Sequence, residues 1–170
     1  MAKSNYLCGI IFFFLFNLSV TLGIACLENT YLSQIGVREL TGKNDGKQIE
    51  AYQKVTKAPK QSPYCASFVA WCFVQCEIKT VQSAWSPSWF PQDKIIYKQG
   101  KGITPQTGDV FGLYYPSKKR VAHVGFIHKW GDQYIITVEA NTNDAGSREG
   151  DGVYKKRRLK RQIYIVSRWL

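Results

Sequence analysis

The sequence predicts a single α+β domain in which N-terminal helices pack on an antiparallel β-sheet. Helical signals are confined to the first half of the chain, and segments rich in Val, Ile, Tyr and Phe follow in the second half. Helices followed by strands favour an antiparallel sheet over alternating βαβ units. The 170 residues suffice for one ordinary domain and contain no internal repeat or long linker.

Three segments of the first half predict helices. Residues 27–40 carry apolar side chains at helical spacing and stop near a glycine, and residues 47–55 follow a turn at residues 43–46. The best-marked helix spans residues 63–76, with Ser62 as its N-cap and Pro63 at its first position. Its interior, CASFVAWCFVQC, is apolar nearly all round, so we expect a buried central helix.

The second half predicts strands over residues 109–115, 121–129, 134–141 and 162–169, after an aromatic loop, WSPSWF, at residues 85–90. The basic run KKRRLKR at residues 155–161 is interpreted as a solvated edge that guards against aggregation. The same run would also help to hold the protein on an anionic surface.

The N-terminus has the layout of a secretory signal. One lysine precedes an apolar run over residues 7–18, and Gly23 and Ala25 stand at minus three and minus one of a cleavage bond. This predicts a signal peptide over residues 1–25 and a mature domain over residues 26–170. Cleavage would leave Cys26 first, where a bacterial lipoprotein carries its lipid, so membrane attachment is expected only with lipidation there or with an uncleaved anchor. Each alternative predicts export to the periplasm, the cell envelope or the medium.

The composition is strongly basic, with 23 Lys and Arg against 12 Asp and Glu and a net charge of +11. Nucleic acid, an anionic membrane and a bacterial envelope polymer all fit that sign, and export makes nucleic acid the least expected. The turn at residues 44–46 lacks the ligand spacing of an EF-hand calcium loop. Cys72 and Cys76 are interpreted as buried thiols of an apolar helix and not as zinc ligands.

Cys65 is the candidate nucleophile, because it falls at about the third position of the buried helix. Free backbone N–H groups and the helix dipole favour a thiolate there. A thiol hydrolase also needs an imidazole, and the two histidines, His123 and His128, point to opposite faces of one strand, so at most one can face the helix. Glu139 and Asn141 share one face of the next strand, and either could orient the imidazole.

The hairpin between these two strands decides whether the polar groups meet. A two-residue turn at residues 131–132 sets His123 opposite Ala140, on the wrong face. A three-residue loop at residues 130–132 sets it opposite Glu139, and a loop at 131–133 sets it opposite Asn141. The catalytic interpretation therefore predicts a three-residue loop or a β-bulge.

A set of short motifs in this order and spacing resembles the CHAP branch of the papain-like, NlpC-type bacterial cell-wall hydrolases. The resemblance runs from about residue 35 to the C-terminus. Ala140 is a departure, since relatives often carry Gly there. The motifs are IGVRE from residue 35, TG at 41, NDG at 44, PYCASFVAW from 63, GDVF from 108, AHVGF from 122 and VEANTN from 138.

The resemblance implies a papain-like CHAP fold with a curved sheet, and a peptidoglycan amidase or endopeptidase. It makes Cys65 the nucleophile and His123 the general base, with Glu139 and Asn141 orienting the imidazole. It implies no metal or organic cofactor, and it gives peptidoglycan as the partner of a monomeric enzyme. His128 is expected to be structural.

Three aromatic side chains, Tyr64, Trp85 and Trp89, are candidates for substrate binding at the rim of a groove, although Trp85 and Trp89 could equally pack on the core. The alternative function is a non-catalytic envelope-binding protein of the same fold. Binding of intact wall without turnover would favour that alternative.

Overall fold

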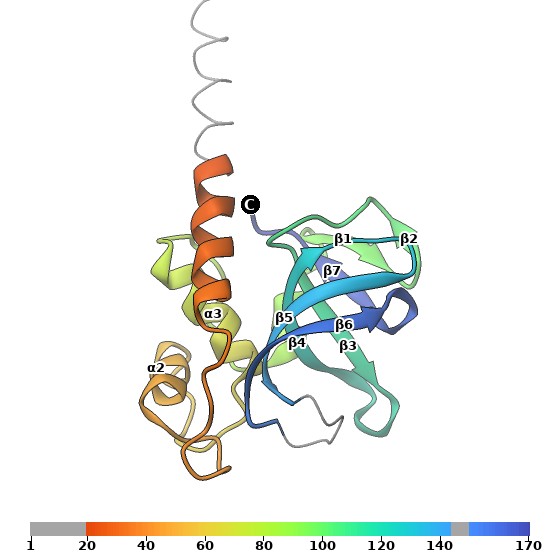
Figure 1. Cartoon of the computed structure of the whole chain (residues 1–170). Helices are drawn as coiled ribbons and strands as arrows, with labels where there is room; N and C mark the ends of the chain where they lie inside the picture. Colours follow the sequence, from red (N-terminus) through yellow and green to blue (C-terminus); the bar gives the residue numbers. More distant parts are fainter. Residues whose placement is uncertain (1–19, 144–149) are drawn as a thin grey trace, which may run out of the picture.

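The computed structural model describes residues 20–143 and 150–170, and it confirms the predicted α+β class (Figure 1). One layer contains a helix over residues 20–33, α2 (Lys47–Val55) and α3 (Cys65–Gln75). Most of the predicted signal peptide, residues 1–19, lies outside the described residues. In the described ranges, no helix is both long and apolar enough to cross a membrane.

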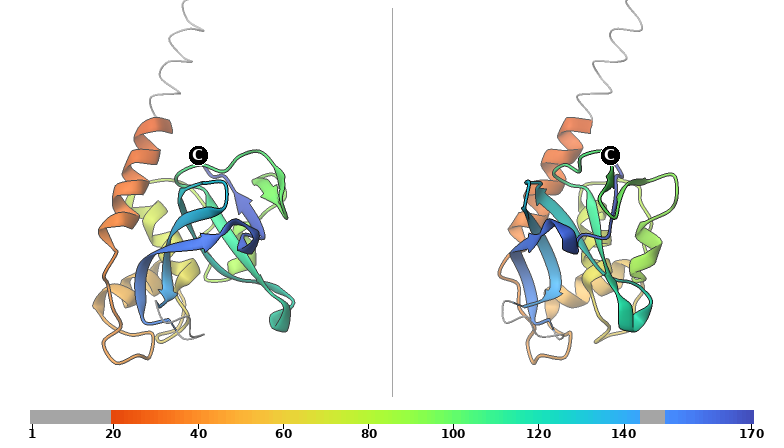
Figure 2. Two further views of the ribbon diagram at one scale, coloured as in Figure 1. Left: turned by 45° about the vertical axis from the view of Figure 1, so that its right-hand side comes forward. Right: turned by 90° about the vertical axis from the view of Figure 1, so that its right-hand side faces the viewer.

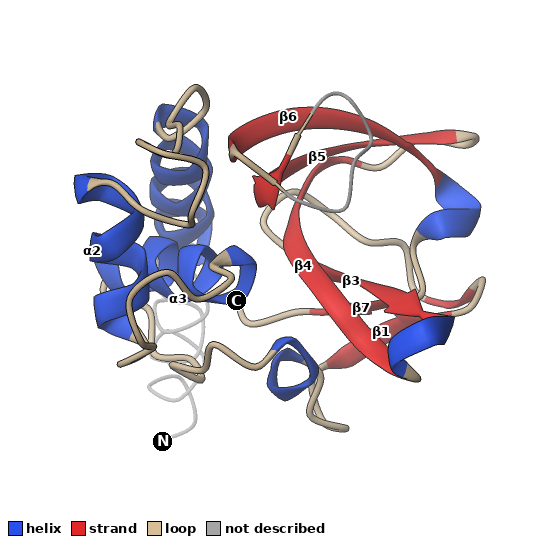
Figure 3. Ribbon diagram, turned by 90° about the horizontal axis from the view of Figure 1, so that it is seen from below, coloured by secondary structure: helices blue, strands red, loops and turns tan. Residues whose placement is uncertain are grey.

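The second layer is a seven-stranded antiparallel sheet with the order β2-β1-β7-β3-β4-β5-β6. Figure 3 shows that the sheet curls, with the helices outside the curl, and Figure 2 shows the C-terminus beside the N-terminal helix. The strands are β1 (Ile95–Lys98), β2 (Lys101–Gly102), β3 (Val110–Tyr115), β4 (Arg120–Lys129), β5 (Tyr134–Thr142), β6 (Gly152–Leu159) and β7 (Ile165–Ser167), and the 3-10 turns are η1 (Ser86–Trp89), η2 (Pro116–Lys118) and η3 (Lys160–Gln162).

Apolar side chains are buried on both faces of the sheet. Phe68 of α3 packs edge-on against Phe126 of β4 in the larger cluster, which joins the sheet to the helices. A smaller cluster on the opposite face contains Phe111 and Ile127. Because side chains alternate along a strand, His123 lies on the face of Ile127, away from the helical layer. His128, which contacts Tyr31 of the N-terminal helix, lies on the other face.

The predicted helix over residues 27–40 is wrong beyond residue 33, whereas the helix over residues 47–55 is confirmed. Gly36, at φ 97°, turns the chain out of the helix. Arg38 then forms an isolated antiparallel bridge with Gly152 at the start of β6. Pairing with a distant strand therefore overrides the apolar periodicity of this segment.

The central helix also begins later than predicted, at Cys65 and not at residue 63, and Ser62 does not cap it. Tyr64 is the N-cap, and its N–H is held by the side chain of Asn141, 3.3 Å away. The carbonyl of Ser62 accepts a hydrogen bond from Gln53 Nε2 at 2.9 Å. These tertiary hydrogen bonds keep residues 62–64 outside the helix.

The predicted strands over residues 109–115, 121–129 and 134–141 agree with β3, β4 and β5. The last predicted strand, residues 162–169, is reduced to the short β7, because η3 precedes it. The basic run belongs to β6 and η3, and β6 is an edge strand as expected. The sequence did not predict β1 and β2.

The connection between β4 and β5 meets the condition set by the catalytic interpretation. Phe126 stands opposite Val138, and a β-bulge shifts the register by one residue close to the connecting loop. Continued along the strands, this register sets His123 opposite Asn141. Glu139 is then the diagonal neighbour of His123 on the same face, within reach of a long side chain.

A disulfide joins the N-terminal helix to the C-terminal end of α3. Cys26 and Cys76 are bonded, with their Cα atoms 5.9 Å apart. The expectation of a buried thiol is therefore wrong for Cys76, because the N-terminal helix brings a second cysteine to it. Cys72 is buried and unbonded, as expected.

Candidate active site

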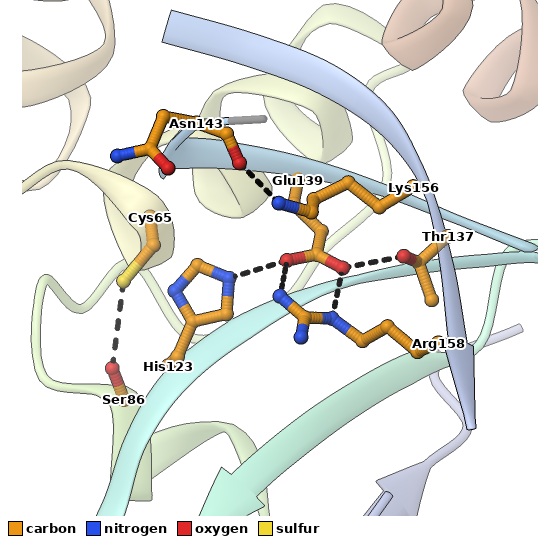
Figure 4. Close-up of polar contacts among 8 residues, drawn as sticks. All are labelled: Cys65, Ser86, His123, Thr137, Glu139, Asn143, Lys156 and Arg158. Carbon is orange, nitrogen blue, oxygen red and sulfur yellow. Dashed lines mark hydrogen bonds and ion pairs between the residues drawn. The ribbon is translucent and has the colours of Figure 1, made fainter. Parts of the chain in front are cut away.

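Cys65 is the first residue of α3 and is only 6% exposed. This is nearer the helix terminus than the third position that the sequence predicted, so its thiol lies beside the free N–H groups of the first turn. Its Sγ lies 3.8 Å from the hydroxyl of Ser86 in η1 (Figure 4).

His123 lies between this thiol and a carboxylate. Its Nε2 is 2.8 Å from Glu139 Oε2, and its other ring nitrogen faces the Cys65 side in Figure 4. The register of β3 and β4 shifts by one residue next to His123, so that Ala122 is the extra residue of a bulge. Bulges of this kind re-aim neighbouring side chains.

Glu139 is fully buried, and its carboxylate accepts hydrogen bonds from three side chains. His123 is one donor, the hydroxyl of Thr137 is the second, and the guanidinium of Arg158 is the third, through Nε and one terminal nitrogen (Figure 4). A buried anion is tolerated when it is paired and hydrogen-bonded in this way.

Electrostatic coupling runs through all three groups. Burial alone would raise the pKa of Cys65, but hydrogen bonding to His123 and its charge, together with Ser86, lower that pKa below its usual value. Burial would lower the pKa of His123, but Cys65 and Glu139 raise it to about 9. Burial would raise the pKa of Glu139, and Arg158 and His123 hold it well below its usual range. The geometry therefore favours a thiolate beside an imidazolium at neutral pH.

Of the two residues that could orient the imidazole, the structure assigns the contact to Glu139. Asn141 sits at φ 56° on a bulge between β5 and β6 and turns toward the helical layer. Its Oδ1 accepts the Tyr64 N–H, and its Nδ2 donates to Asn44 Oδ1 at 2.9 Å. The expectation that Asn141 orients His123 is thus not met; it holds the backbone that precedes Cys65.

The loop before α2 completes this support. Glu39 accepts a hydrogen bond from the Tyr64 hydroxyl at 3.1 Å and another from the Asn44 N–H at 2.9 Å. Gln53 donates to the Asn44 carbonyl at 3.0 Å. The NDG turn therefore connects α2, the start of α3 and Asn141. Its role is structural, because Asn44 holds these segments together through hydrogen bonds.

The three aromatic candidates do not share one environment. Tyr64 and Trp89 are fully buried, Tyr64 on Glu39 and Trp89 in the core, so neither can stack on a substrate. Trp85 is 52% exposed, and the guanidinium of Arg120 lies 4.0 Å from its ring centre. Trp85 therefore stays a candidate for substrate contact.

The sequence did not reveal three residues of the site, Ser86, Thr137 and Arg158, and of these Arg158 carries the charge that balances Glu139. Arg158 lies in the run interpreted as a solvated edge, but its side chain is only 16% exposed and pairs with Glu139. In β6 the exposed residues, Lys155 and Arg157, alternate with the half-buried Lys156 and Arg158. That alternation is invisible in a run of like charges, because every other position carries the same side-chain type.

A sequence model of the CHAP domain matches residues 57–141, half of the chain, so the chain belongs to the CHAP domain family. CHAP domains are generally hydrolases of the amidase or peptidase kind that act on peptidoglycan. The matched segment contains Cys65, His123, Glu139 and Asn141, and ends before Arg158. No curated protein and no solved structure matches the chain.

We expect Arg158→Met to destabilise the fold by about 3–5 kcal/mol at neutral pH, because it leaves the buried Glu139 carboxylate without its guanidinium. A folded-state pKa held below the unfolded value stabilises at pH values above the unfolded pKa, and this contribution is lost as the pH falls. The difference in unfolding free energy between the variant and the unmodified protein should therefore shrink at acidic pH. Urea unfolding across pH measures it.

Arg157→Met is the matched control for this substitution. Arg157 is the exposed neighbour on the opposite face of β6, where its guanidinium lies over the Tyr134 ring. We expect its loss to change stability by less than about 1 kcal/mol. Equal destabilisation by the two variants would contradict a specific role for Arg158.

Proposed function

We propose that this chain is an exported cysteine hydrolase that cleaves amide bonds in bacterial peptidoglycan. Membership of the CHAP family supports the substrate. The observation that carries the chemistry is the imidazole of His123 between the Cys65 thiol and the buried Glu139 carboxylate. Nucleophile, proton carrier and orienting anion in that order are the parts that a thiol hydrolase needs.

In the proposed reaction, the Cys65 thiolate attacks the carbonyl carbon of an amide in the stem peptide or between sugar and peptide. The C–N bond breaks, His123 gives its proton to the leaving amine, and a thioester forms. Water then attacks the thioester with His123 as base, the C–S bond breaks, and a free carboxylate leaves. The proton taken from water stays on His123 beside the regenerated Cys65 thiolate, and the second water proton passes from the product carboxylic acid to solvent.

The surrounding residues hold this geometry. Glu139 fixes the imidazole through Nε2, which leaves the other nitrogen for the thiol and the substrate. Asn141 fixes the N-cap of α3, and thereby the backbone at Cys65. The N–H of Cys65, at the positive end of the helix, is suited to stabilise the oxyanion of the tetrahedral intermediate.

The disulfide supports the proposal of export, because disulfides persist in oxidising compartments outside the cytosol. The predicted cleavage bond after Ala25 precedes Cys26 directly, so processing would leave the bonded cysteine at the new N-terminus. A lipid thioether on Cys26 and the Cys26–Cys76 bond would use the same sulfur and exclude each other. We therefore favour a processed, oxidised chain over residues 26–170 without lipid.

Digestion of purified peptidoglycan tests the catalytic proposal. We expect the oxidised 26–170 protein to release new amines, and Cys65→Ala to lower the rate at least about 1,000-fold, because the nucleophile is gone. Mass spectrometry of the fragments identifies the bond that is cut.

Cys72→Ala is the control, since Cys72 is the other unbonded thiol of α3 and is buried away from His123. It should retain most of the activity. If Cys65→Ala and the unmodified protein both bind wall and neither releases amines, the envelope-binding alternative replaces the hydrolase.

The pH dependence follows from the coupled pair. His123 must be protonated to serve the leaving amine, so kcat/KM should fall above about pH 9, where the imidazolium loses its proton. It should also fall at acidic pH, where the thiolate of Cys65 is protonated. A rate that keeps rising through pH 9 to 10 would show an ordinary thiol without an imidazolium partner.

A further inference from the structure

A groove of about 930 Å³ lies where residues of β1, the end of β3, the end of β6 and η3 come together beside the smaller apolar cluster. Its lining includes the buried Leu113 and Ile163 and the three tyrosines Tyr97, Tyr114 and Tyr164. Tyr114 is 40% exposed, so aromatic surface is available to a bound chain. Aromatic walls of this kind suit a peptide or a sugar ring.

The groove carries a one-sided charge. Three of its lining residues, all in the described part of the chain, are cations and none is acidic. They are Arg158 at the end of β6 and Lys160 and Arg161 in η3. Three of the six cations in the basic run therefore line the groove, whereas the exposed Lys155 and Arg157 lie on the other face of β6.

One end of the groove adjoins the candidate active site. Arg158 lines the groove and binds Glu139, and Leu113 is the register partner of His123. Tyr115 also lines the groove and interacts electrostatically with the site. Burial raises the pKa of Tyr115, the charge of Arg158 lowers this pKa, and the charge of Cys65 raises it. This end of the groove therefore lies beside the Glu139–Arg158 pair and the strand that carries His123.

The positive charge continues on the other side of Tyr115. Arg120 is its register partner, and the Arg120 guanidinium stacks on the exposed Trp85. Trp85 directly precedes Ser86, which contacts the Cys65 sulfur. Stacking and a hydrogen bond from Arg120 Nη1 to the Val121 carbonyl at 2.9 Å restrict the guanidinium, whose remaining N–H groups are donors suited to an anion.

We propose that this groove binds the carboxylate-bearing peptide portion of the wall polymer and leads it to Cys65. The inference rests on the proposed function and names the surface that binds its substrate. Lys160 and Arg161 pair with peptide carboxylates, and the tyrosines pack on the peptide backbone. A second basic hollow, beside α2, has neither a lining free of acidic residues nor aromatic walls. It is lined by lysines together with Glu50, without aromatic side chains, and it belongs to the helical layer.

That second hollow supplies the control. A double variant, Lys160→Gln with Arg161→Gln, removes two charges from the groove. The α2 variant, Lys54→Gln with Lys57→Gln, removes two charges from the second hollow. Both are made in the Cys65→Ala protein, so that binding is measured without turnover. Calorimetric titration uses a soluble stem tetrapeptide with free carboxylates, the same peptide amidated, and a glycerol-phosphate oligomer.

We expect the groove variant to weaken tetrapeptide binding about fivefold to tenfold and the α2 variant less than about twofold. Amidation of the peptide should cause a similar loss with the Cys65→Ala parent, which tests the same contacts without altering the groove. Equal loss in both double variants, or no effect of amidation, would overturn the proposal. Tighter binding of the phosphate oligomer than of the tetrapeptide would overturn the choice of ligand.

The active protein separates this proposal from the proposed function. With Cys65 present, the groove variant should raise KM for wall fragments and leave kcat within about twofold, because its residues do not touch the reacting atoms. If the peptide binds through the groove charges but the active protein releases no amines, the binding proposal is supported and the hydrolase proposal is refuted. Hydrolysis unaffected by the groove variant would do the reverse.

Discussion

The buried carboxylate of Glu139 is the constraint on which the rest of the site depends. An anion with no solvent access needs several donors at once, and here they come from three adjacent strands: His123 from β4, Thr137 from β5 itself and Arg158 from β6. Only one register of these strands brings the donors together, since a shift by one residue moves every side chain to the other face. Charge satisfaction and sheet register therefore support each other.

The second requirement is that α3 presents its first residue to this sheet. The apolar side chains of α3 pack on the helix-facing side of β4, whereas His123 and Glu139 lie on the opposite side of the sheet. The thiol of Cys65 approaches His123 at the N-terminal end of the helix. Asn141 provides the link, because a positive φ on a bulge turns its side chain to the Tyr64 backbone. The disulfide of Cys26 fixes the opposite end of α3 to the N-terminal helix.

Local chemistry made part of this predictable. The turn before residue 47 located α2, Pro63 and the apolar run after it located α3, and segments rich in Val, Ile, Tyr and Phe located β3 to β5. The requirement that His123 meet a polar partner anticipated a loop or bulge in the hairpin. Features set by distant contacts escaped prediction. The bridge of Arg38 with Gly152 takes the chain out of the first helix early, and the N-terminal helix supplies Cys26 for the disulfide with Cys76. The ion pair of Arg158 with Glu139 could not be predicted, because neighbouring positions of the basic run carry the same side-chain type. The burial of Tyr64 and Trp89 likewise depends on partners that no local pattern names.

The most direct test of the account is the pH dependence of Cys65 alkylation by iodoacetamide in the folded protein, followed by peptide mass spectrometry. Cys65 should react at neutral pH as a thiolate, with an apparent pKa well below about 8.5, the value for a free cysteine, and His123→Ala should abolish this shift. Cys72 on the same helix should stay unreactive, because burial raises its pKa well above the usual value. Alkylation of Cys65 that rises only near pH 8.5 to 9, with or without His123, would contradict the charge-coupled site.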